Sequence, residues 1–399
     1  MITENLKQQY TDCVLPTYAR FDAGFVRGEG ATLYDESGRA YIDFASGIGV
    51  NSVGHAHPLW VKAVTEQAAR LVHVSNLYYT QPGGALARRL CQLSGLEKVF
   101  FANSGAEANE GVIKCARKYS HDQYGQASGR STILTLEGSF HGRTVTALSA
   151  TGQDTFHQHF QPFTEGFRHV PAGDAAALER ELARGDVCAV LIELVQGEGG
   201  VLPLDKEYVR TLARLCAERD VLLCADEVQT GIGRTGTWFA FQQYEITPDL
   251  VSFAKGVAGG LPMGGFLTGP KPSGTLTPGA HGSTFGGTPL CAAAALATLD
   301  IVEACLSDVP RKAQYIRDTL TNAAPKALTG IRGAGLMLGL SVSGTPRRYA
   351  ERALEQGLAV LTAGKDAVRL LPPLTISDAE LENGVEILIE VLNERSQPL

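Results

Sequence analysis

The stretch VLLCADEV, residues 221–228, decides the fold of this chain. Five apolar residues follow one another and end at Asp226, which is the pattern of a short strand buried on both faces. The stretch LVSFAK, residues 250–255, repeats the pattern and ends at Lys255. Because amphipathic segments separate such runs, we expect a mainly parallel sheet with helices on both faces.

The same alternation extends outward over residues ~99–270. Three further apolar runs are predicted strands: VFFA (99–102), STILTLEG (131–138) and CAVLIELV (188–195). Apolar residues at helical spacing lie between them over 107–119, 175–185 and 206–220. The sequence therefore predicts an α/β fold whose large domain holds a mostly parallel sheet.

The flanking segments predict a second unit. Alternation and glycines over 25–44 indicate a small hairpin, and an Ala-rich helix over 290–306 opens an α+β segment. We predict an N-terminal segment (1–50) that packs with a small C-terminal domain (291–399), around a large domain over 51–290.

Composition excludes several classes of protein. The chain has 399 residues, 44% of them hydrophobic, a net charge of -7 and no basic run that could follow a nucleic-acid backbone. We find no run of ~20 apolar residues for a membrane helix and no secretory signal at the N-terminus, so we expect a cytoplasmic protein. The eight cysteines contain no C-x-x-C and the nine histidines no ligand spacing, which predicts free thiols and no metal site.

Asp226 and Lys255 lie where ligands bind in such a sheet, beyond the carboxyl ends of the strands. A carboxylate after a buried strand is costly unless it meets a cation or several donors. A capped turn would explain Asp226, and so would a pyridinium nitrogen. Desolvation would lower the pKa of Lys255 and make its amine a nucleophile for a carbonyl, although lysines more often reach the surface.

Two further segments fit the same ligand. Ser104, Gly105 and Ala106 follow a predicted strand and begin a helix, where backbone N–H groups favour a phosphate; simple helix capping is the alternative. Phe140 follows the next strand, where its ring would stack on a flat cofactor or join the core. An anion site, an aromatic plane, an Asp and a Lys in this order are what pyridoxal phosphate requires.

Six ordered segments carry a family resemblance. They are NSGAEANE (103–110), SFHGRT (139–144), QGEGGV (196–201), DEVQTGIGRTG (226–236), SFAKGVAGG (252–260) and HGSTFGGTPL (281–290). They resemble the class III, fold-type I aminotransferases, which include the acetylornithine, ornithine and 4-aminobutyrate enzymes. The likeness covers nearly the whole chain. PTYAR (16–20), Arg143 and RLLPPLTI (369–376) most resemble the acetylornithine branch.

The resemblance implies a pyridoxal 5'-phosphate site. Lys255 would hold the cofactor as a Schiff base and transfer protons, and Asp226 would pair with the ring nitrogen. Ser104, Gly105 and Ala106 would bind the phosphate, and Phe140 would stack on the ring. The other implied cofactor contacts are Glu227, Val228, Gln229 and, across a homodimer, the partner subunit's Thr284.

The resemblance also implies the substrates. Arg143 would bind the carboxylate of an acyl-amino acid, and Arg369 the α-carboxylate of glutamate or 2-oxoglutarate, with Glu198 as its alternate partner. For both arginines a structural salt bridge is the alternative. Ser283 and Tyr18 would approach the substrate, with Glu193 a further candidate. The implied reaction passes the terminal amine of N-acetylornithine to 2-oxoglutarate.

Two departures from the family pattern leave the substrate open. Ala106 stands where many relatives have Thr, and Thr288 where Asn is frequent in the acetylornithine branch. The alternatives are succinylornithine, ornithine, 4-aminobutyrate and carrier-bound aminoadipate semialdehyde.

Rivals of other classes fit less well. Arg143 argues against a glutamate-1-semialdehyde aminomutase. A binding protein that had lost the chemistry would have replaced Lys255 or Asp226. A nucleotide-binding protein would need a G-x-G-x-x-G or Walker motif, which the sequence lacks.

Overall fold

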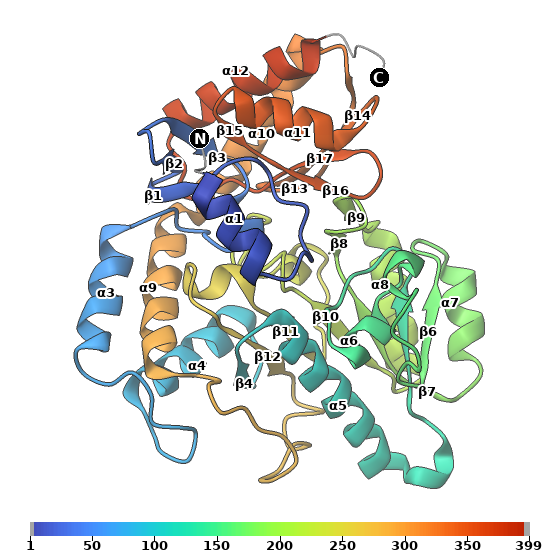
Figure 1. The fold of residues 1–399 in the computed structure, drawn as a ribbon. Coiled ribbons are helices and arrows are strands. Elements are labelled where there is room, and N and C mark those ends of the chain that lie inside the picture. The colour runs from blue at the N-terminus through green and yellow to red at the C-terminus, as the bar shows by residue number, and fades with distance from the viewer. Residues whose placement is uncertain (1–3, 395–399) are drawn as a thin grey trace.

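The largest sheet has seven strands in the order β4-β12-β11-β10-β7-β5-β6 (Figure 1). The computed structural model describes residues 4–394. β12 pairs antiparallel with β11 and with β4, and all other neighbouring pairs are parallel. This confirms the mostly parallel sheet. Its strands are β4 (Lys98–Ala102), β5 (Thr132–Leu136), β6 (Phe167–Val170), β7 (Val187–Ile192), β10 (Leu222–Asp226), β11 (Leu250–Phe253) and β12 (Gly264–Thr268).

The two strands that lie outside the predicted runs are β6 and β12. β6, FRHV, carries two polar side chains, and β12, GGFLT, begins with two glycines. A Cβ at Gly265 would lie 2.3 Å from the Phe100 carbonyl oxygen, so only glycine allows this close approach of β12 to β4.

Helices cover both faces of the sheet, as its continuous apolar strands predict. In β10, Leu222 and Cys224 pack in one cluster with apolar residues of α5 (Gly105–Tyr124). Leu223 and Ala225 face the opposite cluster, with residues of α8 (Lys206–Glu218). The other helices beside this sheet are α4 (Gln81–Ser94), α6 (Val145–Ala150) and α7 (Ala175–Leu182), while α3 (Pro58–Ala68) packs on the outer side of α9 (Pro289–Cys305).

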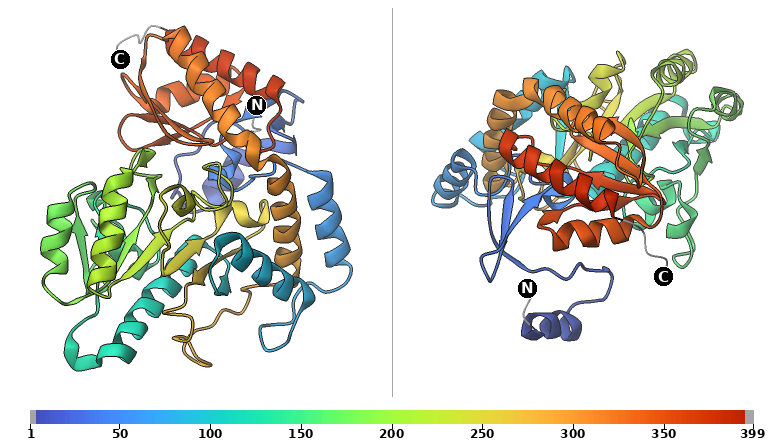
Figure 2. Two further views of the ribbon diagram at one scale, coloured as in Figure 1. Left: turned by 180° about the vertical axis from the view of Figure 1, so that it is seen from behind. Right: turned by 90° about the horizontal axis from the view of Figure 1, so that it is seen from above.

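The two ends of the chain meet in a second region, where the blue and red ribbons lie together in Figures 1 and 2. β1 (Phe25–Glu29), β2 (Thr32–Asp35) and β3 (Ala40–Asp43) form an antiparallel meander, which confirms the expected hairpin. β15 (Leu358–Ala359) joins it parallel to β3. The boundaries near residues 50 and 290 stay a prediction.

The C-terminal part adds a sheet in the order β13-β14-β17-β16. Its elements are α10 (Val309–Ala323), β13 (Leu328–Ala334), β14 (Met337–Val342), α11 (Pro346–Glu355), β16 (Leu361–Ala363), β17 (Ala367–Leu370) and α12 (Asp378–Asn393). The remaining elements are α1 (Glu4–Cys13), α2 (Ser46–Gly49), β8 (Val195–Gln196), β9 (Leu202–Pro203), α9 (Pro289–Cys305) and the 3-10 turns η1 (Gln126–Ser128), η2 (Asp154–Phe156), η3 (Ala240–Gln243), η4 (Lys255–Ala258) and η5 (Leu306–Asp308). Figure 2 shows α1 projecting from the rest of the molecule.

Within residues 4–394, one helical stretch, Pro289–Ala323, is long and apolar enough to cross a membrane by length and composition. It consists of α9 and α10 joined by η5, and α9 packs against α3, α4 and η4. A core helix passes the same test, so this stretch is weak evidence for a membrane span. The eight cysteines are unpaired, and Cys115, Cys188, Cys216 and Cys224 are buried.

Candidate active site

A cavity of about 390 Å³ lies where β10 and β11 end. Asp226 is the last residue of β10, and Lys255 follows β11 as the first residue of η4. The predicted residues that line this cavity are Ser104, Gly105, Ala106, Phe140, Arg143, Glu193, Asp226, Val228, Gln229 and Lys255. The parallel strands therefore bring together groups that are far apart in the sequence.

Asp226 is held by three donors. Its Oδ2 accepts hydrogen bonds from Asn109 Nδ2 (2.7 Å) and His141 Nδ1 (2.8 Å), and its Oδ1 accepts one from the Val228 N–H (3.0 Å). Asp226 is only 4% exposed, so these bonds offset the cost of burying its charge. Sequence reasoning gave Asn109 and His141 no role. Their positions inside the segments 103–110 and 139–144 were the only sequence feature that could have indicated a role for them.

Lys255 presents a partly buried amine. Within residues 4–394 its Nζ has no hydrogen-bonding or ion-pair partner. Burial lowers the pKa of Lys255, and the negative charge of Glu198 opposes this shift. The backbone of Lys255 has a φ of 39°, which lies in the left-handed region. This conformation is strained for a residue with a side chain, and such strain is common at functional sites. An amine with a lowered pKa and no partner suits attack on a carbonyl.

The N-terminus of α5 offers donors to an anion. Ser104 is the N-cap, and its Oγ accepts a hydrogen bond from the Glu107 N–H at 3.2 Å. The N–H groups of Gly105 and Ala106 make no hydrogen bond to any described residue. A Cβ at Gly105 would lie 2.7 Å from Val228 Cγ1, so glycine is needed there. Both capping and anion binding are thus available at this helix start.

Phe140 and Arg143 form one wall of the cavity. The Phe140 N–H donates to Glu193 Oε1 at 2.7 Å. Burial raises the pKa of the Glu193 carboxyl, and the nearby Asp226 raises it further. The guanidinium of Arg143 lies 5.2 Å from the Phe140 ring centre and has no carboxylate partner within residues 4–394. The alternative of a structural salt bridge therefore does not describe Arg143.

Arg369 and Glu198 do form an ion pair. Arg369 Nη1 lies 2.6 Å from Glu198 Oε1 and also donates to Gln229 Oε1 at 3.2 Å. Burial raises the pKa of Glu198, but the charge and hydrogen bond of Arg369 outweigh it, and the net shift is downward. Arg369 is 3% exposed, so its charge needs an anionic partner, either Glu198 or a ligand.

The prediction for Glu227 needs a correction. This residue is fully buried, and its carboxylate accepts hydrogen bonds from the N–H groups of Ala240 (3.0 Å) and Phe241 (2.8 Å). Burial raises its pKa to about 7. Side chains alternate along extended backbone, so Glu227 points away from the cavity that Asp226 and Val228 line. It anchors η3 instead.

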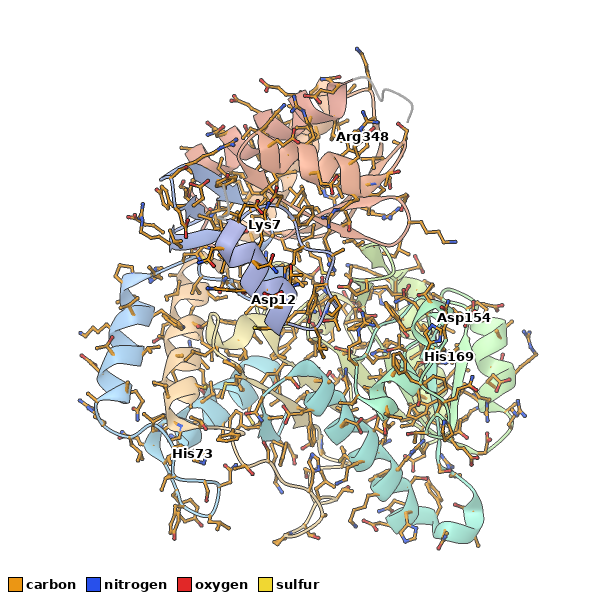
Figure 3. The ribbon with its side chains drawn as sticks, in the orientation of Figure 1. Lys7, Asp12, His73, Asp154, His169 and Arg348 are labelled. Carbon is orange, nitrogen blue, oxygen red and sulfur yellow. The ribbon has the colours of Figure 1, made fainter. Side chains whose placement is uncertain are left out.

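Arg369 and Glu198 are also outside the cavity lining, and so are three further predicted residues: Tyr18, Ser283 and Thr284. Tyr18 is 74% exposed and lines a separate hollow beside the N-terminal segment. Ser283 Oγ accepts a hydrogen bond from Asn103 Nδ2 at 3.2 Å, next to the phosphate-binding candidate, and Thr284 is exposed. The segment that carries both is held by His73, labelled in Figure 3, whose Nδ1 lies 2.9 Å from Thr288 Oγ1.

The donor set fits pyridoxal phosphate. An unpartnered amine, a carboxylate held by Asn109 and His141, a phenyl ring and two free N–H groups line one cavity. Within residues 4–394, no group of three or more His, Cys, Asp or Glu side chains is arranged to hold a metal ion. The arrangement is that of an enzyme acting on an amine or a carbonyl compound through a lysine.

The comparison with known families agrees with this geometry. The model of the family "Aminotransferase class-III" matches residues 16–392. The chain belongs to this family and is an aminotransferase, and the enzymes of this class are pyridoxal-phosphate-dependent.

Individual relatives are similar over their full length. The acetylornithine aminotransferase of Haemophilus ducreyi is 51% identical over 99% of this chain and 100% of that protein. The ornithine aminotransferase of Toxoplasma gondii ME49 has a TM-score of 0.93 at 30% identity, covering 98% of this chain and 95% of that one. The N-acetylornithine aminotransferase of Stenotrophomonas maltophilia K279a has a TM-score of 0.82 at 38% identity, covering 94% and 96%. These neighbours confirm the fold-type I architecture.

Proposed function

We propose that this enzyme transfers the terminal amino group of N-acetylornithine, or a similar acyl-ornithine, to 2-oxoglutarate. The products are N-acetylglutamate 5-semialdehyde and glutamate, a step of arginine biosynthesis in the cytoplasm. The names of the Haemophilus and Stenotrophomonas relatives support this donor, and the likeness to the Toxoplasma enzyme makes ornithine the first alternative.

Pyridoxal 5'-phosphate would be held by residues of this cavity. Lys255 would hold it through its amine, Asp226 would face its ring nitrogen and keep a proton there, and Phe140 and Val228 would enclose its ring. Ser104, Gly105 and Ala106 would bind its phosphate, and Gln229 would lie near its hydroxyl group. When bound, the cofactor supplies a conjugated ring that accepts electrons from the carbon bearing the amine. The amine of Lys255 would also be the base that moves the proton at the carbon bearing the substrate amine.

The observation that carries the proposal is the contrast between the two arginines. Arg143 has no anionic partner, while Arg369 is paired with Glu198 beside the same cavity. Arg143 is therefore ready for the carboxylate of the acyl-amino acid. Arg369 stays paired with Glu198 when the acyl-amino acid is bound. The α-carboxylate of glutamate or 2-oxoglutarate displaces Glu198 and pairs with Arg369 in its place.

We also propose a homodimer that shares its sites. Thr284 is exposed. Its neighbour Ser283 is bonded to the side chain of Asn103, so this segment lies beside the N-terminus of α5. This exposure supports a role for Thr284 at the phosphate of the other subunit's site.

Steady-state kinetics test the donor. The values of kcat/KM with 2-oxoglutarate are measured for N-acetylornithine, N-succinylornithine, ornithine and 4-aminobutyrate. We expect one of the two acyl-ornithines to give the highest value. A higher value for ornithine or 4-aminobutyrate would contradict the proposed substrate while leaving the enzyme class unchanged.

A further inference from the structure

Phe156 contacts two residues of the site although it lies outside every motif of the sequence. Its ring centre is 4.1 Å from the guanidinium carbon of Arg143. It also meets the Phe140 ring edge to face, at 5.6 Å between centres and 72° between planes. Arg143 therefore lies against two aromatic rings, of which Phe156 is the nearer.

The segment that carries Phe156 is tied to the segment that carries Phe140 and Arg143. Four hydrogen bonds join residues 151–153 to residues 138–141: Gly138 N–H to Gly152 O (2.7 Å), Gly152 N–H to Ser139 Oγ (3.1 Å), Gln153 Nε2 to Ser139 O (3.0 Å) and His141 N–H to Thr151 Oγ1 (3.0 Å).

The turn η2 follows directly and ends at Phe156. The Phe156 N–H donates to Gln153 O at 3.0 Å, and Asp154, which opens η2, is labelled beside His169 of β6 in Figure 3. These hydrogen bonds hold the two segments together and place the ring of Phe156 beside Arg143.

We propose that Phe156 is a specificity-determining positioning residue, which holds the Arg143 guanidinium toward the carboxylate of the amino donor. Within residues 4–394, Arg143 has no carboxylate to orient it and its side chain is exposed. An arginine without such a support samples many rotamers and loses that freedom when it binds a ligand. The aromatic face of Phe156 restricts the rotamers of Arg143 before a ligand binds. The inference rests on the proposed function, in which Arg143 binds the donor's carboxylate.

The test compares two donors that differ only in the carboxylate: N-acetylornithine and N-acetylputrescine. A cation–π contact at an exposed site changes an equilibrium by about 2- to 5-fold. We expect Phe156→Leu to lower the ratio of kcat/KM for N-acetylornithine over N-acetylputrescine by this factor. Phe156→Tyr keeps the aromatic face and should restore the wild-type ratio.

A binding measurement gives a readout without turnover. N-Acetylnorvaline has the carboxylate and acyl group of the donor but no terminal amine, so it binds without reacting. Calorimetry with the holoenzyme should show its Kd rising in Phe156→Leu by the same factor as the kinetic ratio. In the background of Arg143→Met, Phe156→Leu should have no further effect on the ratio, because the contact is already lost.

The outcomes separate the inference from the proposed function. If the wild-type enzyme does not prefer N-acetylornithine to N-acetylputrescine, the carboxylate contact fails and this inference fails with it. If that preference is present and Phe156→Leu leaves it unchanged, only the inference fails. A Phe156→Leu effect that persists in the Arg143→Met background would also overturn it, since Phe156 would then act through Phe140 or the fold.

Discussion

Replacing Glu198 by Gln removes the charge that balances Arg369 and keeps the shape of the side chain. The two side chains lie 2.6 Å apart, and Arg369 is 3% exposed against 29% for Glu198. A hydrogen bond between charged groups contributes about 1.5–3 kcal/mol, and the partial exposure of Glu198 favours the lower part of this range. About 1.5–2 kcal/mol corresponds to a roughly 10- to 30-fold change in an equilibrium.

The change should act in opposite directions on the two amino donors. Glutamate brings its own α-carboxylate to Arg369 and no longer has to displace Glu198. N-Acetylornithine leaves Arg369 without a charged partner. We therefore expect the ratio of kcat/KM for glutamate over N-acetylornithine to rise about 10- to 30-fold in Glu198→Gln.

Stopped-flow absorbance with each donor alone measures the two half-reactions separately. Asp186→Asn is the matched control, because it removes the carboxylate of another arginine pair, with Arg168 at 2.7 Å. Asp186 directly precedes β7, so it lies at the opposite end of the strands from the site. Its ratio should equal that of the wild type. A Glu198→Gln ratio within twofold of the wild type would refute the exchange of partners at Arg369.

Three further predictions follow from the site. Arg143→Met should lower kcat/KM for N-acetylornithine by about 10- to 100-fold, measured at steady state, since a charged hydrogen bond is lost. Asp226→Asn should lower kcat at least about 100-fold, measured with cofactor saturating, because the charge facing the ring nitrogen is gone. Burial raises the pKa of Glu227 from 4.5 to about 7, so the folded state keeps a proton that the unfolded state loses, and stability falls as the pH rises through this window. The effect is about 3 kcal/mol, or roughly 4 °C in Tm. The Tm deficit of Glu227→Gln should shrink by this amount between pH 5 and 8, as seen by calorimetry; a constant deficit would mean that Glu227 is charged throughout.

The sequence was sufficient to predict that Asp226 and Lys255 lie at one cavity. Asp226 and Lys255 each end an apolar run, and such runs become adjacent parallel strands whose carboxyl ends share one edge. Helical spacing after residue 104 likewise placed Gly105 and Ala106 at a helix N-terminus, which the structure confirms. These predictions succeed because strand and helix periodicity are local properties of the chain.

The partners of these groups could not be predicted from periodicity. Asn109 and His141 meet Asp226 through side chains that come from α5 and from the loop after β5. Phe156 reaches Arg143 only because hydrogen bonds fix one loop against another. Alternation along residues 226–228 indicates that the side chain of Glu227 points away from those of Asp226 and Val228. The prediction of a cofactor contact for Glu227 was wrong because it assigned every residue of the motif to the same face.

The assignment of Lys255 is tested most directly by trapping. The protein saturated with pyridoxal phosphate should absorb near ~420 nm, as expected of an imine conjugated to the pyridine ring. Borohydride reduction followed by peptide mass spectrometry should then find the phosphopyridoxyl group on Lys255, and Lys255→Ala should lose both the band and the label. A label on another lysine, or a wild-type protein without the band in the presence of cofactor, would contradict the central claim.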